Sequence, residues 1–330
     1  MINQDGENLV FIFSTPRAGS TLLSAILSGH ARIHSPNEPW FLLSLAGMYE
    51  QNVAVSAGFD YRLARMAFRE LAPRGDFLSA ARAFALEIYN RRLAAAGKDI
   101  LVDKTPRYCH ILPFINDLFP KAKKIWLRRN PLDVAASFRN TWKAHLDEMT
   151  GQRITRLTFD LVPSTAHLCD FFEAQPGLEL RYEDLAREPE PVIAKLCDYL
   201  NIAPQNDLAR YSRDNPGLDA MKDKMMGDKA VFLHGALDSK SIDAWKTTFS
   251  RRETQSLARA FGESLLHRAG YASVAEELRQ LKITFPSAEA SEQSLANYRA
   301  LFPSHNWTFW DEEPSAPKKA SKWWRRPQAV

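Results

Sequence analysis

Residues 9–30 read LVFIFSTPRAGSTLLSAILSGH and contain the strongest strand and helix signals of the chain. The run at 9–14 is apolar up to Ser14, as expected for a parallel strand that is buried on both faces. A turn at 15–19 follows, and from Ser20 the apolar residues recur at helical spacing until about Gly29. The stretch therefore predicts a strand, a loop and a helix, in that order.

Further strand and helix pairs follow the first one along the chain. Apolar runs predict strands at 100–102, 124–127 and 178–182, and helical spacing predicts the helices 111–119, 132–142 and 191–200. This alternation favours an α/β fold of three layers, with a central, mainly parallel sheet and helices on both faces. We expect helical insertions at about 38–97 and 145–175, one domain over 1–302, and a tail over 303–330 that is poorly ordered or wraps around the domain.

Composition excludes several classes of protein. The three cysteines are far apart and fit no metal site or disulfide framework, and the first apolar run is too short for a signal peptide or a membrane span. Five basic and no acidic residues lie in 314–330, so without this tail the net charge of +4 becomes about −1. The body of the chain therefore does not indicate a nucleic-acid-binding protein, and we expect a cytoplasmic protein.

The loop at 14–21, STPRAGST, lies where a strand ends and a helix begins. Free backbone N–H groups and the positive end of the helix dipole bind phosphate or sulfate at such a place. Gly19 allows a close approach, Ser20 and Thr21 add hydroxyl donors, and Arg17 adds a planar cation. The loop is not a Walker A sequence, because no Lys follows its glycine. The alternative is an ordinary turn with Ser20 as the helix N-cap.

Two segments together give a family resemblance. STPRAGSTLL at 14–23 resembles the 5′-phosphosulfate loop of sulfotransferases that use 3′-phosphoadenosine 5′-phosphosulfate (PAPS), and IWLRRNPLDVAASF at 125–138 resembles their 3′-phosphate motif. The resemblance is closest to the bacterial branch and covers roughly residues 8–200. It implies a P-loop-like fold, PAPS as co-substrate and no metal. The positions that it assigns to PAPS binding are Pro16, Arg17, Ala18, Gly19, Ser20, Thr21, Arg129, Ser137, Tyr182, Ser239 and Lys240.

The resemblance also suggests catalytic residues. Lys104 matches a lysine that binds the leaving oxygen, and Arg17 would share that charge. Many cytosolic relatives carry a histidine base two residues after that lysine, where this chain has Pro106. Protein-tyrosine sulfotransferases place a glutamate soon after the first helix instead, which makes Glu38 the expected general base.

Each of these assignments has an alternative. Glu38 would otherwise be an acid at a helix N-terminus, and Lys104 a surface lysine. Tyr182 would otherwise serve packing alone. Asp243-Ala244-Trp245-Lys246 is similar to a short segment near the family's last PAPS contacts, but Trp245 would otherwise be a core aromatic. His34 and His110 are the other candidate bases.

The sequence is compatible with three functions. The first is transfer of a sulfuryl group from PAPS to a hydroxyl on a small molecule, lipid or glycan. The second is a P-loop-type small-molecule kinase, which predicts a GK[ST] sequence and a Mg²⁺ carboxylate that the sequence lacks. The third is a non-catalytic relative that only binds nucleotide or glycan. Trp323 and Trp324 beside basic residues in the tail predict either peripheral contact with an anionic membrane or a cap on the domain's own core.

Overall fold

The computed structural model describes the chain except for residues 37, 50–60, 206–207, 209–238 and 302–330. The predicted tail at 303–330 therefore lies outside the described residues, and its order and contacts stay predictions. Among the described residues, no helix is both long and apolar enough to cross a membrane.

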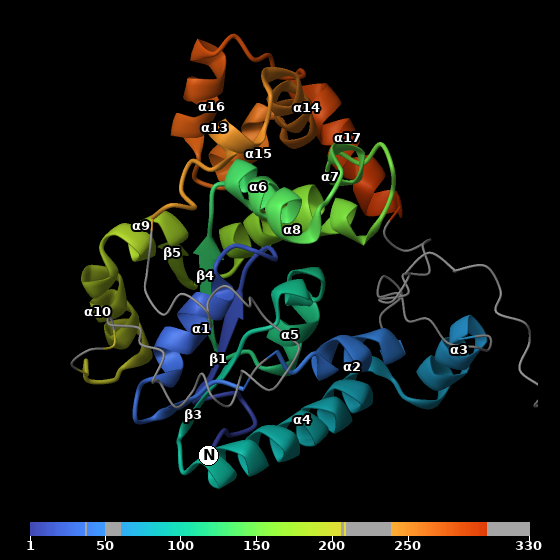
Figure 1. The fold of residues 1–330 in the computed structure, drawn as a ribbon. Helices are drawn as coiled ribbons and strands as arrows, with labels where there is room; N and C mark the ends of the chain where they lie inside the picture. The colour runs from blue at the N-terminus through green and yellow to red at the C-terminus, as the bar shows by residue number, and fades with distance from the viewer. Residues whose placement is uncertain (37, 50–60, 206–207, 209–238, 302–330) are drawn as a thin grey trace, which may run out of the picture.

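The centre of the domain is a five-stranded parallel sheet with the order β2-β3-β1-β4-β5 (Figure 1). The strands are β1 Leu9–Phe13, β2 Ile33–His34, β3 Ile100–Asp103, β4 Lys123–Arg128 and β5 Leu178–Arg181. The four predicted strands are confirmed. The two-residue β2 was not predicted, and it lies beside β3 at one edge of the sheet.

The helices alternate with the strands as predicted. The first half of the chain contains α1 Ser20–Ser28, α2 Phe41–Tyr49, α3 Tyr61–Leu71, α4 Arg74–Ala96, the 3₁₀ helix η1 Pro106–His110, α5 Leu112–Leu118, α6 Pro131–Trp142, α7 Leu146–Met149 and α8 Arg156–Ala174. The second half contains α9 Tyr182–Arg187, α10 Pro189–Leu200, α13 Trp245–Thr248, α14 Arg251–Phe261, α15 Glu263–Arg268, α16 Ala272–Gln280 and α17 Ala288–Leu301. The segments 38–97 and 145–175 contain α2 to α4 and α7 to α8, and their role as insertions stays a prediction.

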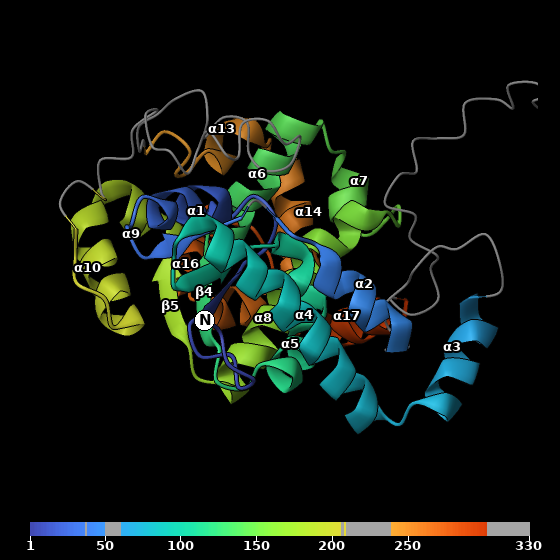
Figure 2. The same ribbon diagram turned by 90° about the horizontal axis from the view of Figure 1, so that it is seen from below.

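The sheet carries a separate apolar layer on each face, because successive side chains of a strand point to opposite sides. Leu9, Phe11 and Phe13 belong to a core shared with α4, α5, α8 and the C-terminal helices. Val10 and Ile12 pack with residues of α1, α9 and α10 on the other face. The continuous apolar run of β1 is thus explained by burial on both faces, and the three-layer α/β fold is confirmed (Figure 2).

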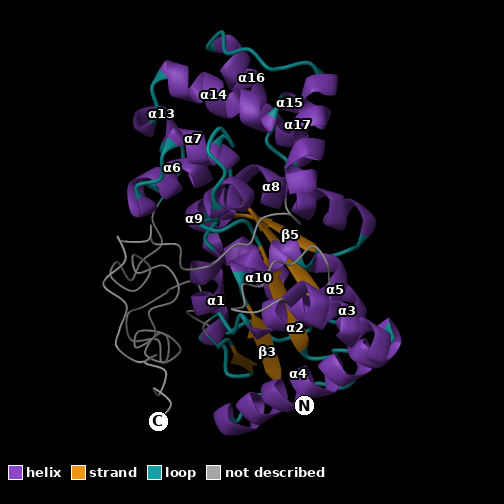
Figure 3. Ribbon diagram, turned by 90° about the vertical axis from the view of Figure 1, so that its right-hand side faces the viewer, coloured by secondary structure: helices purple, strands orange, loops and turns teal. Residues whose placement is uncertain are grey.

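The C-terminal helices lie beyond the carboxyl ends of the strands. Figure 3 shows α13 to α17 gathered with α6, α7 and α8 at one end of the sheet. The link to α6 includes Asp133, whose carboxylate accepts the backbone N–H groups of Asp243 at 2.9 Å and Trp245 at 3.0 Å. This contact places the segment 239–245 beside the first turn of α6.

Candidate active site

The sheet order brings the predicted site residues together. β1 lies between β3 and β4, and all three strands run in the same direction. The loop after β1, Lys104 after β3 and Arg129 after β4 therefore meet at the carboxyl edge of the sheet, where parallel α/β folds place their ligand sites.

The loop after β1 depends on an unusual backbone. Arg17 has φ of 67° and Gly19 has φ of 96°, both in the left-handed region. A Cβ on Gly19 would lie 2.4 Å from Cδ2 of Tyr182, so only glycine fits. Gly19 is also the N-cap of α1, and no side chain caps this helix end. The alternative with Ser20 as N-cap is therefore wrong, and the loop brings its backbone close to Tyr182.

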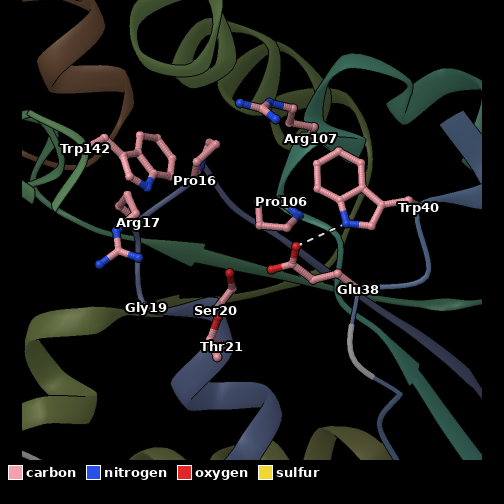
Figure 4. Close-up of a pocket in the computed structure, with 10 residues that line it drawn as sticks. All are labelled: Pro16, Arg17, Gly19, Ser20, Thr21, Glu38, Trp40, Pro106, Arg107 and Trp142. Carbon is pink, nitrogen blue, oxygen red and sulfur yellow. Dashed lines mark hydrogen bonds between the residues drawn. The ribbon is translucent and has the colours of Figure 1, made fainter. Parts of the chain in front are cut away.

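A pocket of about 140 Å³ opens above this loop (Figure 4). It is lined by Pro16, Arg17, Gly19, Ser20, Thr21, Glu38, Trp40, Pro106, Arg107 and Trp142. The predicted loop residues and the predicted base thus share one cavity, while Trp40, Arg107 and Trp142 were not predicted to be site residues. Ala18 is fully buried.

Lys104 and Glu38 form a buried ion pair at the pocket. Nζ of Lys104 lies 2.6 Å from Oε1 of Glu38, and the two side chains are 0% and 8% exposed. The same ammonium donates to Oγ1 of Thr21 at 3.2 Å. Lys104 is therefore not a surface lysine. Glu38 is not a helix N-terminal acid either, because α2 begins at Phe41 and has no acidic residue in its first turn.

A buried polar cluster lies next to Lys104. Asp103, fully buried, accepts hydrogen bonds from Tyr89 at 2.6 Å, Thr105 at 3.2 Å and Tyr108 at 3.3 Å. Burial raises the pKa of Asp103 to about 7, although these three hydroxyl donors and Lys104 act to lower it. The cluster fixes the end of β3 and so fixes the starting point of the Lys104 side chain.

The candidate base His110 is occupied elsewhere. Its Nε2 lies 4.0 Å from Oδ1 of Asp160, which also binds Arg107. Burial alone would lower the pKa of His110, but Cys109 and Asp160 beside the ring raise it to about 9. A histidine with this pKa is protonated at neutral pH and cannot accept a proton. His34 is the last residue of β2, and among the described residues neither histidine lines the pocket.

Arg129 and Ser137, which follow β4, both contact the loop at Arg17. Arg129 donates to the carbonyls of Arg17 and Ser241, each at 2.9 Å, and its guanidinium lies 4.5 Å from the ring centroid of Tyr182. Its buried Nε–H has no hydrogen-bond partner among the described residues. Ser137 accepts from Nε of Arg17 at 3.1 Å. The side chain of Arg17 is thus directed towards α6, not towards Lys104.

The segment before α13 contacts Arg129 and Tyr182 through Ser241, which was not predicted to be a site residue. The Tyr182 hydroxyl lies 2.7 Å from Oγ of Ser241, so packing is not the only contact of Tyr182. Ser239 and Lys240 precede it and are exposed. Trp245 is 2% exposed and belongs to the core, as its packing interpretation predicted.

Comparisons with known proteins agree with this architecture. A sequence profile described as the sulfotransferase family matches residues 9–207. Nodulation protein NoeE of Sinorhizobium fredii is 29% identical over 320 residues, which are 92% of this chain and 73% of that protein. Protein-tyrosine sulfotransferase 1 of Danio rerio is 26% identical over 219 residues, which are 62% of this chain and only 56% of that protein.

Solved structures match over most of the chain as well. The sulfotransferase domain of the Synechococcus PCC 7002 olefin synthase superposes with a TM-score of 0.55 and 25% identity, covering 80% of this chain and 94% of that domain.

Proposed function

This chain belongs to the sulfotransferase family, and we propose that it transfers a sulfuryl group from PAPS to a hydroxyl on a small molecule, lipid or glycan. The observation that carries the proposal is the contact of the buried Lys104 with both Thr21 and Glu38, which line the pocket beside the anion loop. A cation, a hydroxyl donor and a carboxylate are the groups that a sulfuryl transfer needs at its two reacting oxygens.

The loop after β1, together with Arg129 and Ser137 beside it, supports a site for the nucleotide. In this proposal the residues 16–21 bind the 5′-phosphosulfate through backbone N–H groups and the hydroxyls of Ser20 and Thr21. Arg129 and Ser137 bind the 3′-phosphate. The buried Nε–H of Arg129, which has no partner in the part of the chain that the structure describes, is a donor that such an anion would satisfy. Tyr182, Ser239 and Lys240 complete the proposed contacts.

The reaction divides between Lys104 and Glu38. The acceptor oxygen forms a bond to sulfur while the bond from sulfur to the bridging oxygen breaks, and adenosine 3′,5′-bisphosphate leaves. Glu38 takes the proton of the acceptor hydroxyl, and Lys104, with Thr21, stabilises the charge on the leaving oxygen. Arg17 also belongs to the proposed site. Because it contacts Ser137, we propose that it acts between the sulfate and the 3′-phosphate.

A screen of hydroxyl acceptors with ³⁵S-labelled PAPS tests the proposal. We expect label in at least one acceptor and an increase in melting temperature with PAPS but not with ATP and Mg²⁺. Stabilisation by ATP alone would favour a kinase. Stabilisation by PAPS without transfer to any acceptor would favour a non-catalytic relative.

The subcellular localisation is a further part of the proposal. We propose a cytoplasmic enzyme, with peripheral membrane contact through the basic, Trp-rich residues of the tail as a separate hypothesis. Deleting residues 316–330 should abolish binding to anionic vesicles at unchanged melting temperature if the tail is a membrane contact. A full-length protein that does not bind such vesicles contradicts that hypothesis.

A further inference from the structure

Trp40 has a backbone conformation that L-residues rarely adopt. Its φ is 60°, and the N–H of Phe41 donates to the carbonyl of Pro39 at 2.7 Å, which closes a three-residue turn around Trp40. A turn of this kind with positive φ is strained. Such strain persists where the surroundings fix the residue, and it concentrates at functional sites. The strain indicates that the contacts of Trp40 fix its position.

The indole of Trp40 contacts the proposed base. Its Nε1–H donates to Oε2 of Glu38 at 3.2 Å, while Lys104 binds Oε1 of the same carboxylate at 2.6 Å. Figure 4 shows the indole and the Glu38 carboxylate facing each other in the pocket. The two oxygens of Glu38 are thus held by two different donors, one charged and one neutral.

Trp40 is in turn held from two sides. The guanidinium of Arg107 lies 5.7 Å from the centroid of the indole ring, within the range of a cation–π contact. Arg107 makes two hydrogen bonds to Asp160, at 2.8 and 2.5 Å, and Asp160 lies buried on the insertion helix α8. On the backbone side, the N–H of Trp40 donates to Oγ1 of Thr105 at 3.4 Å.

Asp160 and Arg107, which hold Trp40 in place, stay charged over a wide pH range. Burial alone would raise the pKa of Asp160, but the charge and hydrogen bonds of Arg107, with help from His110, lower it to about 2. Asp160 is therefore ionised at neutral pH and keeps the Arg107 guanidinium in one place. Through Arg107, helix α8 of the second insertion reaches the pocket wall formed by Trp40.

We propose that Trp40 is a positioning residue for Glu38. This inference rests on the proposed function, because it assigns Trp40 to the base of that reaction. In the proposed reaction Lys104 turns one of its three N–H donors towards the leaving oxygen. The indole N–H then keeps Oε2 in place, so that Oε1 stays directed at the acceptor hydroxyl. Without the indole N–H, the carboxylate is free to turn away from the reacting oxygen.

A double-mutant cycle with Trp40→Phe and Glu38→Gln tests this role in sulfate transfer. Phe keeps the aromatic body but lacks the N–H, so we expect kcat to fall about tenfold with KM for PAPS unchanged, as for a lost hydrogen bond to a charged group. In the Glu38→Gln protein the same change should have no further effect on kcat, because the group that Trp40 positions is already inactive. Equal losses in both backgrounds would overturn the proposal.

Trp142→Phe is the matched control. Trp142 is the other indole of the pocket, and it packs on Phe138 with 4.8 Å between ring centroids. Whatever its own effect, we expect that effect to be the same with and without Glu38→Gln. Coupling to Glu38 of equal size at both tryptophans would show a general effect of the pocket walls and would overturn the specific role of Trp40.

A spectroscopic measurement tests the contact without any acceptor. In ¹⁵N-labelled protein, the indole N–H resonance that disappears in Trp40→Phe belongs to Trp40. We expect Glu38→Gln to move it upfield, since an amide is a weaker acceptor than a carboxylate. An unmoved resonance overturns the role of Trp40 and leaves the proposed function intact. Full turnover of Glu38→Gln overturns the base assignment itself, and the role of Trp40 with it.

Discussion

The carboxylate of Glu38 and the ammonium of Lys104 are 2.6 Å apart, and both side chains are almost completely buried. In an in-line transfer the incoming and leaving oxygens lie on opposite sides of the sulfur atom. An ammonium has three N–H donors and a carboxylate accepts several hydrogen bonds, so each partner can take on a further contact. In the proposed reaction these contacts are the acceptor hydroxyl for Glu38 and the bridging oxygen for Lys104.

The first prediction concerns the base. Glu38→Gln keeps the shape of the side chain but cannot accept the proton of the acceptor. We expect turnover to fall about 10²–10⁴-fold, with PAPS affinity little changed. Glu179→Gln is a suitable control, because Glu179 pairs with Arg128 outside the pocket. Normal turnover of Glu38→Gln would refute the base assignment, and loss of folding would indicate a structural role for Glu38.

The second prediction concerns the 3′-phosphate. Arg129→Ala removes the charge partner of a desolvated anion, a loss of roughly 2–5 kcal/mol, so PAPS should bind at least about thirtyfold more weakly. Ser137→Ala should cost only about 1 kcal/mol.

Calorimetric titration with PAPS measures both effects, and Arg128→Ala is the neighbouring control. Arg128 pairs with Glu179 and lies 4.1 Å from the ring centroid of Trp126, so its loss should leave PAPS affinity close to that of the wild type. Wild-type affinity in both Arg129→Ala and Ser137→Ala would show that the 3′-phosphate binds elsewhere.

Local sequence patterns predicted the centre of the fold well and its edge poorly. β1 and α1 follow from a continuous apolar run and a helical repeat, both of which are local signals. β2 consists of Ile33 and His34 only, and it is a strand because Ile33 lies opposite Ile100. No pattern in two residues reveals a partner that is so far away in the sequence.

In the site too, contacts between residues distant in the sequence could not be predicted from local patterns. The family resemblance gave Glu38 and Lys104 separate catalytic roles, and the structure pairs the two side chains. The direction of Arg17 was not predictable, because it follows from a positive φ at a non-glycine residue. Ser241 contacts Tyr182 across 59 residues of sequence, and Asp160 contacts Arg107 across 53. Neither stands in a motif, so only the folded chain identifies them.

The third prediction concerns pH. The pKa of His110 is raised from 6.5 to about 9 in the folded protein. A raised pKa contributes stability that is fully present below about pH 6.5 and is lost as the pH rises through about 9. The contribution is on the order of 3 kcal/mol. In urea unfolding, the stability difference between wild type and His110→Gln should therefore shrink between pH 6.5 and 9.5.

The exposed His267 provides the comparison for this measurement. It lies 3.6 Å from Glu263 at the surface, where ion pairs contribute little, so His267→Gln should change stability only slightly at each pH. A His110→Gln difference that stays constant from pH 6.5 to 9.5 would contradict the protonated state of His110. It would also restore His110 as a candidate base.

The fourth prediction uses two glycines with the same backbone conformation. Gly19 and Gly97 both have positive φ, 96° and 61°, but a Cβ would lie 2.4 Å from the Tyr182 ring at Gly19 and would touch nothing within 4 Å at Gly97. Alanine at either position costs roughly 1–2 kcal/mol for the left-handed backbone. At Gly19 the contact with Tyr182 adds roughly 1–3 kcal/mol and pushes the anion loop away from Tyr182. We therefore expect both variants to melt at lower temperature, but only Gly19→Ala to lose PAPS binding in calorimetric titration. Equal PAPS affinity in the two variants would show that the close approach of the loop to Tyr182 is not needed for binding.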